Sequence, residues 1–487
     1  MKKSLLLKNT LIILIIGFVV KLIGMFGKIV TTRILGIEGM SMYVLSYPTL
    51  LLFVNISGFS LNNTISKLVS EAIASKKYSP KKILYNSIKI SLLISFICII
   101  VYLSSIKMIS KLLLKNEELF NPLLAGVILI PLVGISDALR GYFNGIKQIN
   151  YASISLLLEQ ITRTTISVLG VMIGVLYSNI IATSFLFIAL AFGEISSIIY
   201  CLIKLKKNPP IDIKNTTGEN QIIFKTSFSL TLSRIIGSIS FFLEPIIYTF
   251  ILSHLNYDTG IIHSTYTTID AFVIPLLTII SFIPFSLSTA IIPHISEANA
   301  KNDHQSLNYF INRAYTFTIY PATLCLLIIT IYHNELMLII YNSSVGAELS
   351  GKVSMFFLFY YINAITSSIL QALGAVKELF INSFAMNLLR LFLIIVLSFF
   401  PTINLLSILF SIIITSFIST VNLFITLFRK IKYKINISNI LIYFLISLST
   451  FFILLLFNHF NLNFIISIIL CTLYFSGLFI LKIKNRI

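Results

Sequence analysis

The chain is a succession of long apolar stretches separated by short polar segments. Fourteen stretches of 20 or more mostly apolar residues follow one another, centred near residues 22, 53, 95, 130, 164, 191, 237, 275, 320, 361, 390, 415, 447 and 472. A helix of about 20 apolar residues crosses a hydrocarbon core of roughly 30 Å. The pattern therefore predicts an all-α polytopic membrane protein with fourteen transmembrane helices and no soluble domain.

One sequence pattern occurs twice. Phe59-Ser60-Leu61, followed by Ser70-Glu71-Ala72, returns 226 residues later as Phe285-Ser286-Leu287, followed by Ser296-Glu297-Ala298. Further matches in the same order pair Lys21-Leu22-Ile23-Gly24 with Arg234-Ile235-Ile236-Gly237, and Gly145 with Gly374. Such a duplication is typical of two-lobed transporters. We expect a six-helix lobe over residues 1–207, a cytoplasmic linker over 208–221, a second six-helix lobe over 222–434, and helices 13 and 14 over 435–487.

Composition and charge support the membrane assignment. Hydrophobic residues make up 57% of the chain and charged residues 11%, against about 45–50% and about 25% in soluble domains. The net charge of +19 would suit a nucleic-acid partner, but the basic residues are concentrated in alternate loops between the predicted spans. If the N-terminus is cytoplasmic, 25 of the 36 Lys and Arg residues, with Arg140 among them, lie in loops on the cytoplasmic side. The positive-inside rule then predicts a multi-pass cell-membrane protein with both termini cytoplasmic, and no nucleic-acid partner.

Five basic residues lie deep inside predicted spans: Lys21, Lys28, Arg163, Arg234 and Arg390. A cation that faces lipid at mid-membrane costs at least about 2.5 kcal/mol, so these side chains must face acids or a water-filled cavity. Acids within the spans are fewer and scattered. We therefore expect a central cationic cavity that binds an anionic substrate such as a phosphate or pyrophosphate.

Three intramembrane acids, Glu159, Glu194 and Asp270, are our candidates for gating or coupling. Glu159 precedes Arg163 by one helical turn, the favourable order for an intrahelical ion pair, and a purely structural pair is the alternative interpretation. A proton or sodium site at Glu194 is the alternative to a gating role.

Motifs of enzymes are missing from the sequence. It contains no Walker loop, no glycine-rich dinucleotide fingerprint and no histidine and cysteine cluster. We expect no catalytic residue, no metal site and no cofactor.

Several strings in the first 200 residues carry a family resemblance. They are Lys8-Asn9-Thr10-Leu11, Lys21-x-x-Gly24 with Lys28 and Arg33, Gly36-x-Glu38-Gly39 with Tyr43, Ile65-Ser66-Lys67-Leu68-Val69-Ser70-Glu71-Ala72, Leu139-Arg140-Gly141-Tyr142-Phe143-Asn144-Gly145, Glu159-Gln160-x-x-Arg163, and Gly193-Glu194. The chain resembles stage V sporulation protein B and its polysaccharide-transport relatives. These belong to the multidrug, oligosaccharidyl-lipid and polysaccharide (MOP) exporter superfamily, which also contains the lipid II flippases.

The resemblance implies a fold and a function. It implies a V-shaped pair of six-helix lobes that alternates between inward and outward openings, with two extra helices that guide a polyprenyl tail. In lipid II flippases basic residues of the first helix are functional, and Lys21 and Lys28 occupy the matching positions. Lysine keeps the charge there but not the bidentate geometry of arginine.

We therefore expect a flippase for undecaprenyl-pyrophosphate-linked saccharide, such as the lipid II peptidoglycan precursor used in spore cortex. The expected partners are this lipid-linked saccharide and membrane lipids, with cell-wall synthases as further candidates, and the expected state is a monomer. Two alternatives remain: an O-unit or capsule polysaccharide flippase, and a cation-coupled multidrug exporter, which should have twelve helices and an acid-rich lobe.

Overall fold

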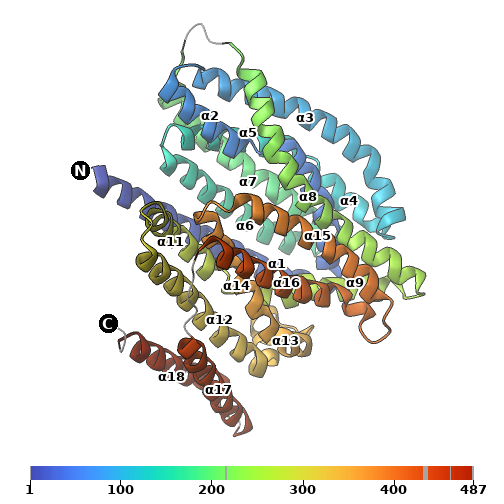
Figure 1. The fold of residues 1–487 in the computed structure, drawn as a ribbon. Helices are drawn as coiled ribbons and strands as arrows, with labels where there is room; N and C mark the ends of the chain where they lie inside the picture. Colours follow the sequence, from blue (N-terminus) through green and yellow to red (C-terminus); the bar gives the residue numbers. More distant parts are fainter. Residues whose placement is uncertain (1, 214–216, 432–436, 461, 485–487) are drawn as a thin grey trace. The chain divides into compact units, whose positions relative to one another are not determined.

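The computed structural model describes residues 2–213, 217–431, 437–460 and 462–484, and every regular element in these ranges is a helix (Figure 1). The predicted all-α fold is confirmed. Residues 214–216 of the expected linker, and residues 435–436, 461 and 485–487 of the expected C-terminal pair, lie outside the described ranges.

Eleven helical stretches in the described part of the chain are long and apolar enough to cross a membrane. The first, Ile15–Ser75, has 61 residues, enough for two crossings, and its backbone leaves helical geometry at Gly36, where φ is 61° and ψ is −159°. Residues 259–300 form several short helices, and the last apolar helix, Phe464–Phe479, is shorter than the eleven. The count of fourteen spans stays a prediction, and it differs from the eleven stretches in these three regions.

Contacts divide the chain into two compact units, which are described separately. Unit 1 comprises Met1–Thr267 and Ile394–Leu405. Its helices are α1 (Lys2–Gly58), α2 (Leu61–Ser75), α3 (Pro80–Met108), η1 (Ile109–Leu113), η2 (Glu117–Leu119), α4 (Phe120–Gly126), α5 (Leu129–Gly145), α6 (Ile149–Gly174), α7 (Asn179–Lys207), α8 (Glu219–His254) and α9 (Thr259–Thr267).

Unit 2 comprises Thr268–Leu393 and Leu406–Ile487. Its helices are η3 (Thr268–Val273), α10 (Ile274–Leu277), α11 (Phe282–Ala300), α12 (His304–Tyr341), α13 (Ala347–Val353), η4 (Ser354–Phe357), α14 (Leu358–Ala372), most of α15 (Val376–Ser398), α16 (Ser407–Lys430), α17 (Ile437–His459) and α18 (Phe464–Lys484), while η5 (Asn404–Leu406) lies at the boundary. The boundary between the units follows Thr267, whereas the expected linker covers residues 208–221. The division into two lobes stays a prediction.

Local sequence explains where the helices begin. The Ser79 side chain accepts the Lys82 amide, and Pro80 occupies the first turn of α3, where its missing N–H is not needed. Ser178 caps α7 in the same way by accepting the Ile181 amide at 3.2 Å. The long interiors are helical because a helix satisfies every backbone group internally in the absence of water.

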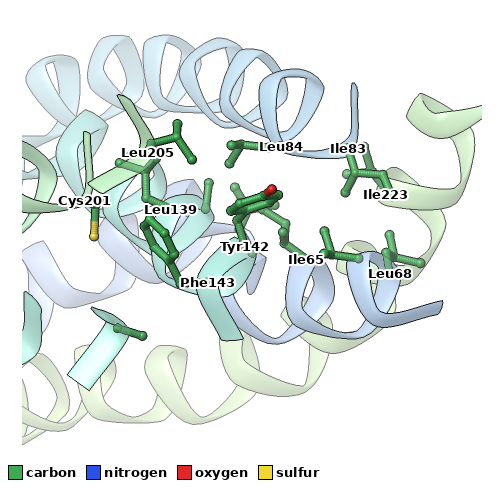
Figure 2. Close-up of a cluster of buried hydrophobic side chains, with 14 of the residues drawn as sticks. Ile65, Leu68, Ile83, Leu84, Leu139, Tyr142, Phe143, Cys201, Leu205 and Ile223 are labelled. Atoms are coloured by element: carbon green, nitrogen blue, oxygen red, sulfur yellow. The ribbon is translucent and has the colours of Figure 1, made fainter. Parts of the chain in front are cut away.

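A buried apolar cluster lies between α2, α3, α5, α6, α7 and α8 of unit 1, and Figure 2 shows most of its side chains. The labelled side chains are Ile65 and Leu68 of α2, Ile83 and Leu84 of α3, Leu139, Tyr142 and Phe143 of α5, Cys201 and Leu205 of α7, and Ile223 of α8. The glycines of α5 allow the close approach of α2. A Cβ on Gly141 would lie 2.7 Å from the Asn62 carbonyl oxygen, and one on Gly145 would lie 2.7 Å from Val69 Cβ.

In unit 2, α17 and α18 pack against α12. The Tyr320 ring of α12 meets Tyr443 of α17 at 4.7 Å and Phe475 of α18 at 5.7 Å between ring centroids. The Tyr443 hydroxyl donates to the Ile319 carbonyl at 3.2 Å. Most other side chains described on these two helices are apolar, and many are exposed.

Candidate functional site

Arg140 on α5 is the centre of a buried group of charged side chains in unit 1. It is 4% exposed. Its Nη2 atom donates to Ser136 Oγ at 2.8 Å, and lies 3.3 Å from both Asp137 Oδ1 and Glu194 Oε2. Its Nη1 atom contacts Glu159 Oε2. Arg140 therefore ties its own helix to α6 through Glu159 and to α7 through Glu194.

Glu159 joins this arginine to a second one. Its other carboxylate oxygen accepts a hydrogen bond from Arg163 Nη2 one turn further along α6, so the expected Glu159 and Arg163 pair is present. We call Asp137, Arg140, Glu159, Arg163 and Glu194 the ion cluster. Three carboxylates and two guanidinium groups give it a formal charge of −1.

Arg234 of α8 interacts electrostatically with Asp137 and brings the formal balance near the ion cluster to zero. Of the five basic residues singled out in the sequence, Arg163 thus pairs with Glu159, and the positive charge of Arg234 acts on Asp137. The Arg234 side chain is nevertheless exposed. An exposed guanidinium keeps its charge and can bind an anion.

Close helix packing positions the ion cluster. A Cβ on Gly193 of α7 would lie 3.0 Å from the Glu159 carbonyl oxygen and 3.2 Å from Arg163 Cβ. The absence of a side chain at this position lets α7 approach α6, as is common for small residues between membrane helices. Glu194, the next residue, is thereby brought within reach of Arg140 and Ser136.

Lys21 and Lys28 lie on α1, which also approaches α6 through glycines. A Cβ on Gly24 would lie 3.1 Å from Gln160 Nε2, and one on Gly27 would lie 2.8 Å from Thr164 Cγ2. Residues 21, 24 and 28 share one helix face because of their spacing. The Lys21 side chain is partly buried and has an interaction partner, and Lys28 is exposed.

The remaining two candidates belong to unit 2. Arg390 is partly buried on α15, and Asp270 is partly buried in η3. Unit 1 therefore brings Glu159, Arg163 and Glu194 together and sets Arg234 near them, while Arg390 and Asp270 are not members of the ion cluster.

Sequence analysis was wrong about Arg140, which it placed in a cytoplasmic loop. The α5 helix continues to Gly145, so Arg140 lies on a buried helix face one turn before the end. Asp137 and Arg140 have the i, i+3 spacing of a helical ion pair. That spacing was the one signal that could have revealed the residue.

Comparisons with known proteins agree with this fold. Residues 6–298 match the family model described as "Polysaccharide biosynthesis protein". The chain is 31% identical over 416 residues to stage V sporulation protein B of Bacillus subtilis (strain 168), a match that spans 84% of this chain and 80% of the relative. It is 22% identical over 406 residues to the lipid II flippase MurJ of the same organism, over 77% of this chain and 74% of MurJ.

Solved structures share the fold over most of the chain. A structure of the lipid II flippase MurJ in an inward closed conformation matches 98% of this chain and 99% of its own, with a TM-score of 0.69 and 17% identity. An inward-facing multidrug resistance MATE family transporter of the MOP superfamily matches 84% of this chain and 94% of its own, with a TM-score of 0.66 and 13% identity.

The apolar helices and the shared fold indicate a multi-pass membrane protein, and the relatives named above include a lipid II flippase and a multidrug transporter of the MOP superfamily. The chain belongs to the polysaccharide biosynthesis protein family.

Proposed function

We propose that this protein is a flippase that moves undecaprenyl-pyrophosphate-linked saccharide across the cytoplasmic membrane by alternating access. The observation that carries the proposal is its 22% identity to a lipid II flippase over 77% of the chain. On the same ground the proposed substrate is the lipid II peptidoglycan precursor. A role in sporulation, in the synthesis of spore cortex, is proposed from the 31% identity to a stage V sporulation protein.

The proposed topology has fourteen spans and both termini in the cytoplasm. Division of α1 at Gly36 adds one span to the eleven, the broken segment at residues 259–300 adds a second, and α18 adds a third. An even number of spans agrees with the charge of the loops. In this layout residues 1–207 and 222–434 are two six-helix lobes joined by the linker over 208–221, and residues 435–487 add helices 13 and 14. The protein acts as a monomer, and cell-wall synthases are its candidate protein partners.

The proposed substrate site is cationic. Lys21, Lys28, Arg163, Arg234 and Arg390 bind the pyrophosphate, whose oxygens accept charge-assisted hydrogen bonds. Lys21 and Lys28 share a helix face, and Arg234 is exposed. A cationic centre argues against a cation-coupled drug exporter, which should have an acid-rich lobe.

Glu159, Glu194 and Asp270 have the gating role. The ion cluster spans α5, α6 and α7, so an anion that draws Arg163 away from Glu159 changes the balance of charge between these helices. A buried cluster with uncompensated charge is costly, which favours rearrangement of the helices that carry it. Substrate binding and lobe movement are linked in this way.

A second candidate function is supported by the family match. The family description names polysaccharide biosynthesis, and an O-unit or capsule flippase differs from a lipid II flippase in the saccharide alone. Vesicles that contain the full chain test this: we expect lipid II to be transported faster than the same lipid carrying an O-unit saccharide. Faster transport of the O-unit lipid would assign the protein to capsule or O-unit synthesis.

A further inference from the structure

Unit 2 contains a polar cavity between α14, α15 and α16, three helices that are candidate membrane spans. Its volume is about 390 Å³. Pockets that hold small ligands measure about 300–1,000 Å³. The lining residues are Asn363, Ser367, Ser368 and Gln371 of α14, Leu379, Asn382, Ser383, Met386 and Asn387 of α15, and Ser419 of α16. Amide and hydroxyl groups thus dominate the wall, and none of the lining side chains is charged.

One side of the cavity is fixed by hydrogen bonds between the helices. Ser419 Oγ accepts from Asn363 Nδ2 at 2.6 Å and from Asn382 Nδ2 at 2.8 Å. Asn422 Nδ2, outside the cavity, donates to Asn382 Oδ1 at 2.7 Å. The Asn382 side chain is 6% exposed. These contacts hold the three helices in a defined geometry around the cavity.

Other polar side chains of the wall are not used in this way. Ser367, Gln371, Ser383 and Asn387 make no side-chain hydrogen bond to any residue in the described part of the chain. Interhelical packing does not require these polar groups, and Gln371 and Ser383 are exposed while Ser367 and Asn387 are partly buried, so their polar atoms can bind water or a ligand. Their donors and acceptors are available to a neutral, hydroxyl-rich molecule.

The cavity lies next to a proposed pyrophosphate contact. Leu379, Asn382, Ser383, Met386 and Asn387 recur at the spacing of one helix face, and Arg390 continues that face one turn further along α15. Arg390 and Ser383 are separated by about 10 Å along the axis at 1.5 Å per residue. An anionic contact and a neutral polar cavity therefore follow one another on one helix.

We propose that this cavity binds the saccharide head group of the transported lipid, while Arg390 contacts its pyrophosphate. The inference rests on the proposed flippase function and adds the residues that recognise the sugar. Gln371, Ser383 and Asn387 donate to and accept from sugar hydroxyl and acetamido groups, and Leu379 and Met386 contact the apolar face of the ring.

Binding to the full chain in detergent tests this proposal. The two probes are radiolabelled polyprenyl pyrophosphate without sugar and the same lipid carrying a neutral disaccharide. We expect Asn387→Leu and Gln371→Leu to weaken binding of the disaccharide lipid about tenfold, since each removes one or two hydrogen bonds, and to leave binding of the bare lipid unchanged. Ser383→Ala, at an exposed position, should weaken binding of the disaccharide lipid about threefold. This smaller substitution tests the cavity if the two leucine variants do not fold.

Two matched controls separate recognition from packing. Asn422→Leu removes the hydrogen bond to Asn382 without lining the cavity, so the ratio of the two affinities should stay that of the wild type. Arg390→Gln should weaken the binding of both lipids equally, because both carry the pyrophosphate. The proposal is overturned if the cavity variants weaken the binding of both lipids equally, or weaken the binding of neither.

Failure of the two proposals can be told apart in the wild-type protein. Equal affinity for the two lipids overturns the saccharide site alone. Binding of neither lipid overturns the flippase function and the saccharide site together.

Discussion

Arg140 and Glu194, 54 residues apart in the chain, lie 3.3 Å apart in the structure, with side chains 5% and 7% exposed. This contact joins α5 to α7, and Glu159 extends it to α6. Opposite charges buried this deeply must remain paired or rearrange together. The contact therefore makes the ion cluster a structural element of unit 1 that depends on its balance of charge.

Replacement of Arg140 should destabilise the protein strongly. Arg140→Gln leaves Glu194 and Glu159 buried with less compensation, which costs about 3 kcal/mol or more. We expect a large drop in the unfolding temperature in detergent. Part of this loss should return in the double variant Arg140→Gln with Glu194→Gln, because the uncompensated carboxylate is then removed.

A surface pair supplies the control. Lys301 contacts Glu297 at 2.6 Å, and both side chains are more than 60% exposed. Ion pairs exposed to solvent contribute little to the free energy of unfolding. Lys301→Gln should leave the unfolding temperature unchanged, and a drop as large as that of Arg140→Gln would show that burial of the ion cluster is not the cause.

The ion cluster also shows how far the sequence alone could be interpreted. The Glu159 and Arg163 pair was predictable because both residues lie on one helix at a fixed spacing. The role of Arg140 was not predictable, because it depends on how α6 and α7 pack against α5. The assignment of basic residues to loops gives no information about that packing. Gly36 is similar: the sequence predicts two helices near residues 22 and 53, but only the backbone shows that they form one helix broken at Gly36.

The segment before α8 is attached to α3 by a carboxylate whose pKa is shifted. The Lys81 ammonium, which lies 3.1 Å from Asp212 Oδ2, and secondly the Ser79 hydroxyl hold the pKa of Asp212 below its ordinary value. A lowered folded-state pKa stabilises the folded state above the unfolded pKa of about 3.9, and this contribution is lost as pH falls through the folded value. The contribution of Asp212 to the stability of this attachment should therefore be constant from pH 8 to pH 5.

Hydrogen exchange checks this prediction. The Ile213 amide donates to Ser79 Oγ at 3.2 Å, next to the Asp212 contact. We expect Asp212→Asn to speed exchange at residues 211–213 at pH 7, and Glu71→Gln, in an exposed pair with Lys67, to leave it unchanged. Protection in the wild type that disappears between pH 7 and pH 5, after correction for intrinsic rates, would contradict the assignment.

The two C-terminal helices should contact the lipid tail. They lie outside the proposed duplication, pack on α12 through Tyr320, and expose many apolar side chains. A photoactivatable polyprenyl probe should label residues of α17 and α18. Tyr320→Ala, which removes the ring that both helices contact, should reduce this labelling. Labelling confined to helices before α17 would argue against a groove for the tail.

Membrane potential should be able to drive the cycle. Outward movement of a pyrophosphate in an inside-negative membrane gains about 2.3 kcal/mol per charge per 100 mV if the full potential is crossed. The basic side chains of the empty site then return inward in the same favourable field. Transport should respond to a potassium and valinomycin potential without a sodium or pH gradient. Transport that ignores this potential, follows an ion gradient and is lost in Glu194→Gln would instead assign ion coupling to Glu194.

Translocation of a lipid-linked saccharide in vesicles that contain the full chain tests the central claim most directly. We expect the wild type to move undecaprenyl-pyrophosphate-linked disaccharide between leaflets. Lys21→Ala and Arg234→Ala should abolish this movement while still inserting and accumulating, because each removes a cation from the proposed pyrophosphate site. Lys89→Ala, at an exposed position on α3, should transport like the wild type. Wild-type vesicles without translocation, or full translocation by both Lys21→Ala and Arg234→Ala, would contradict the account.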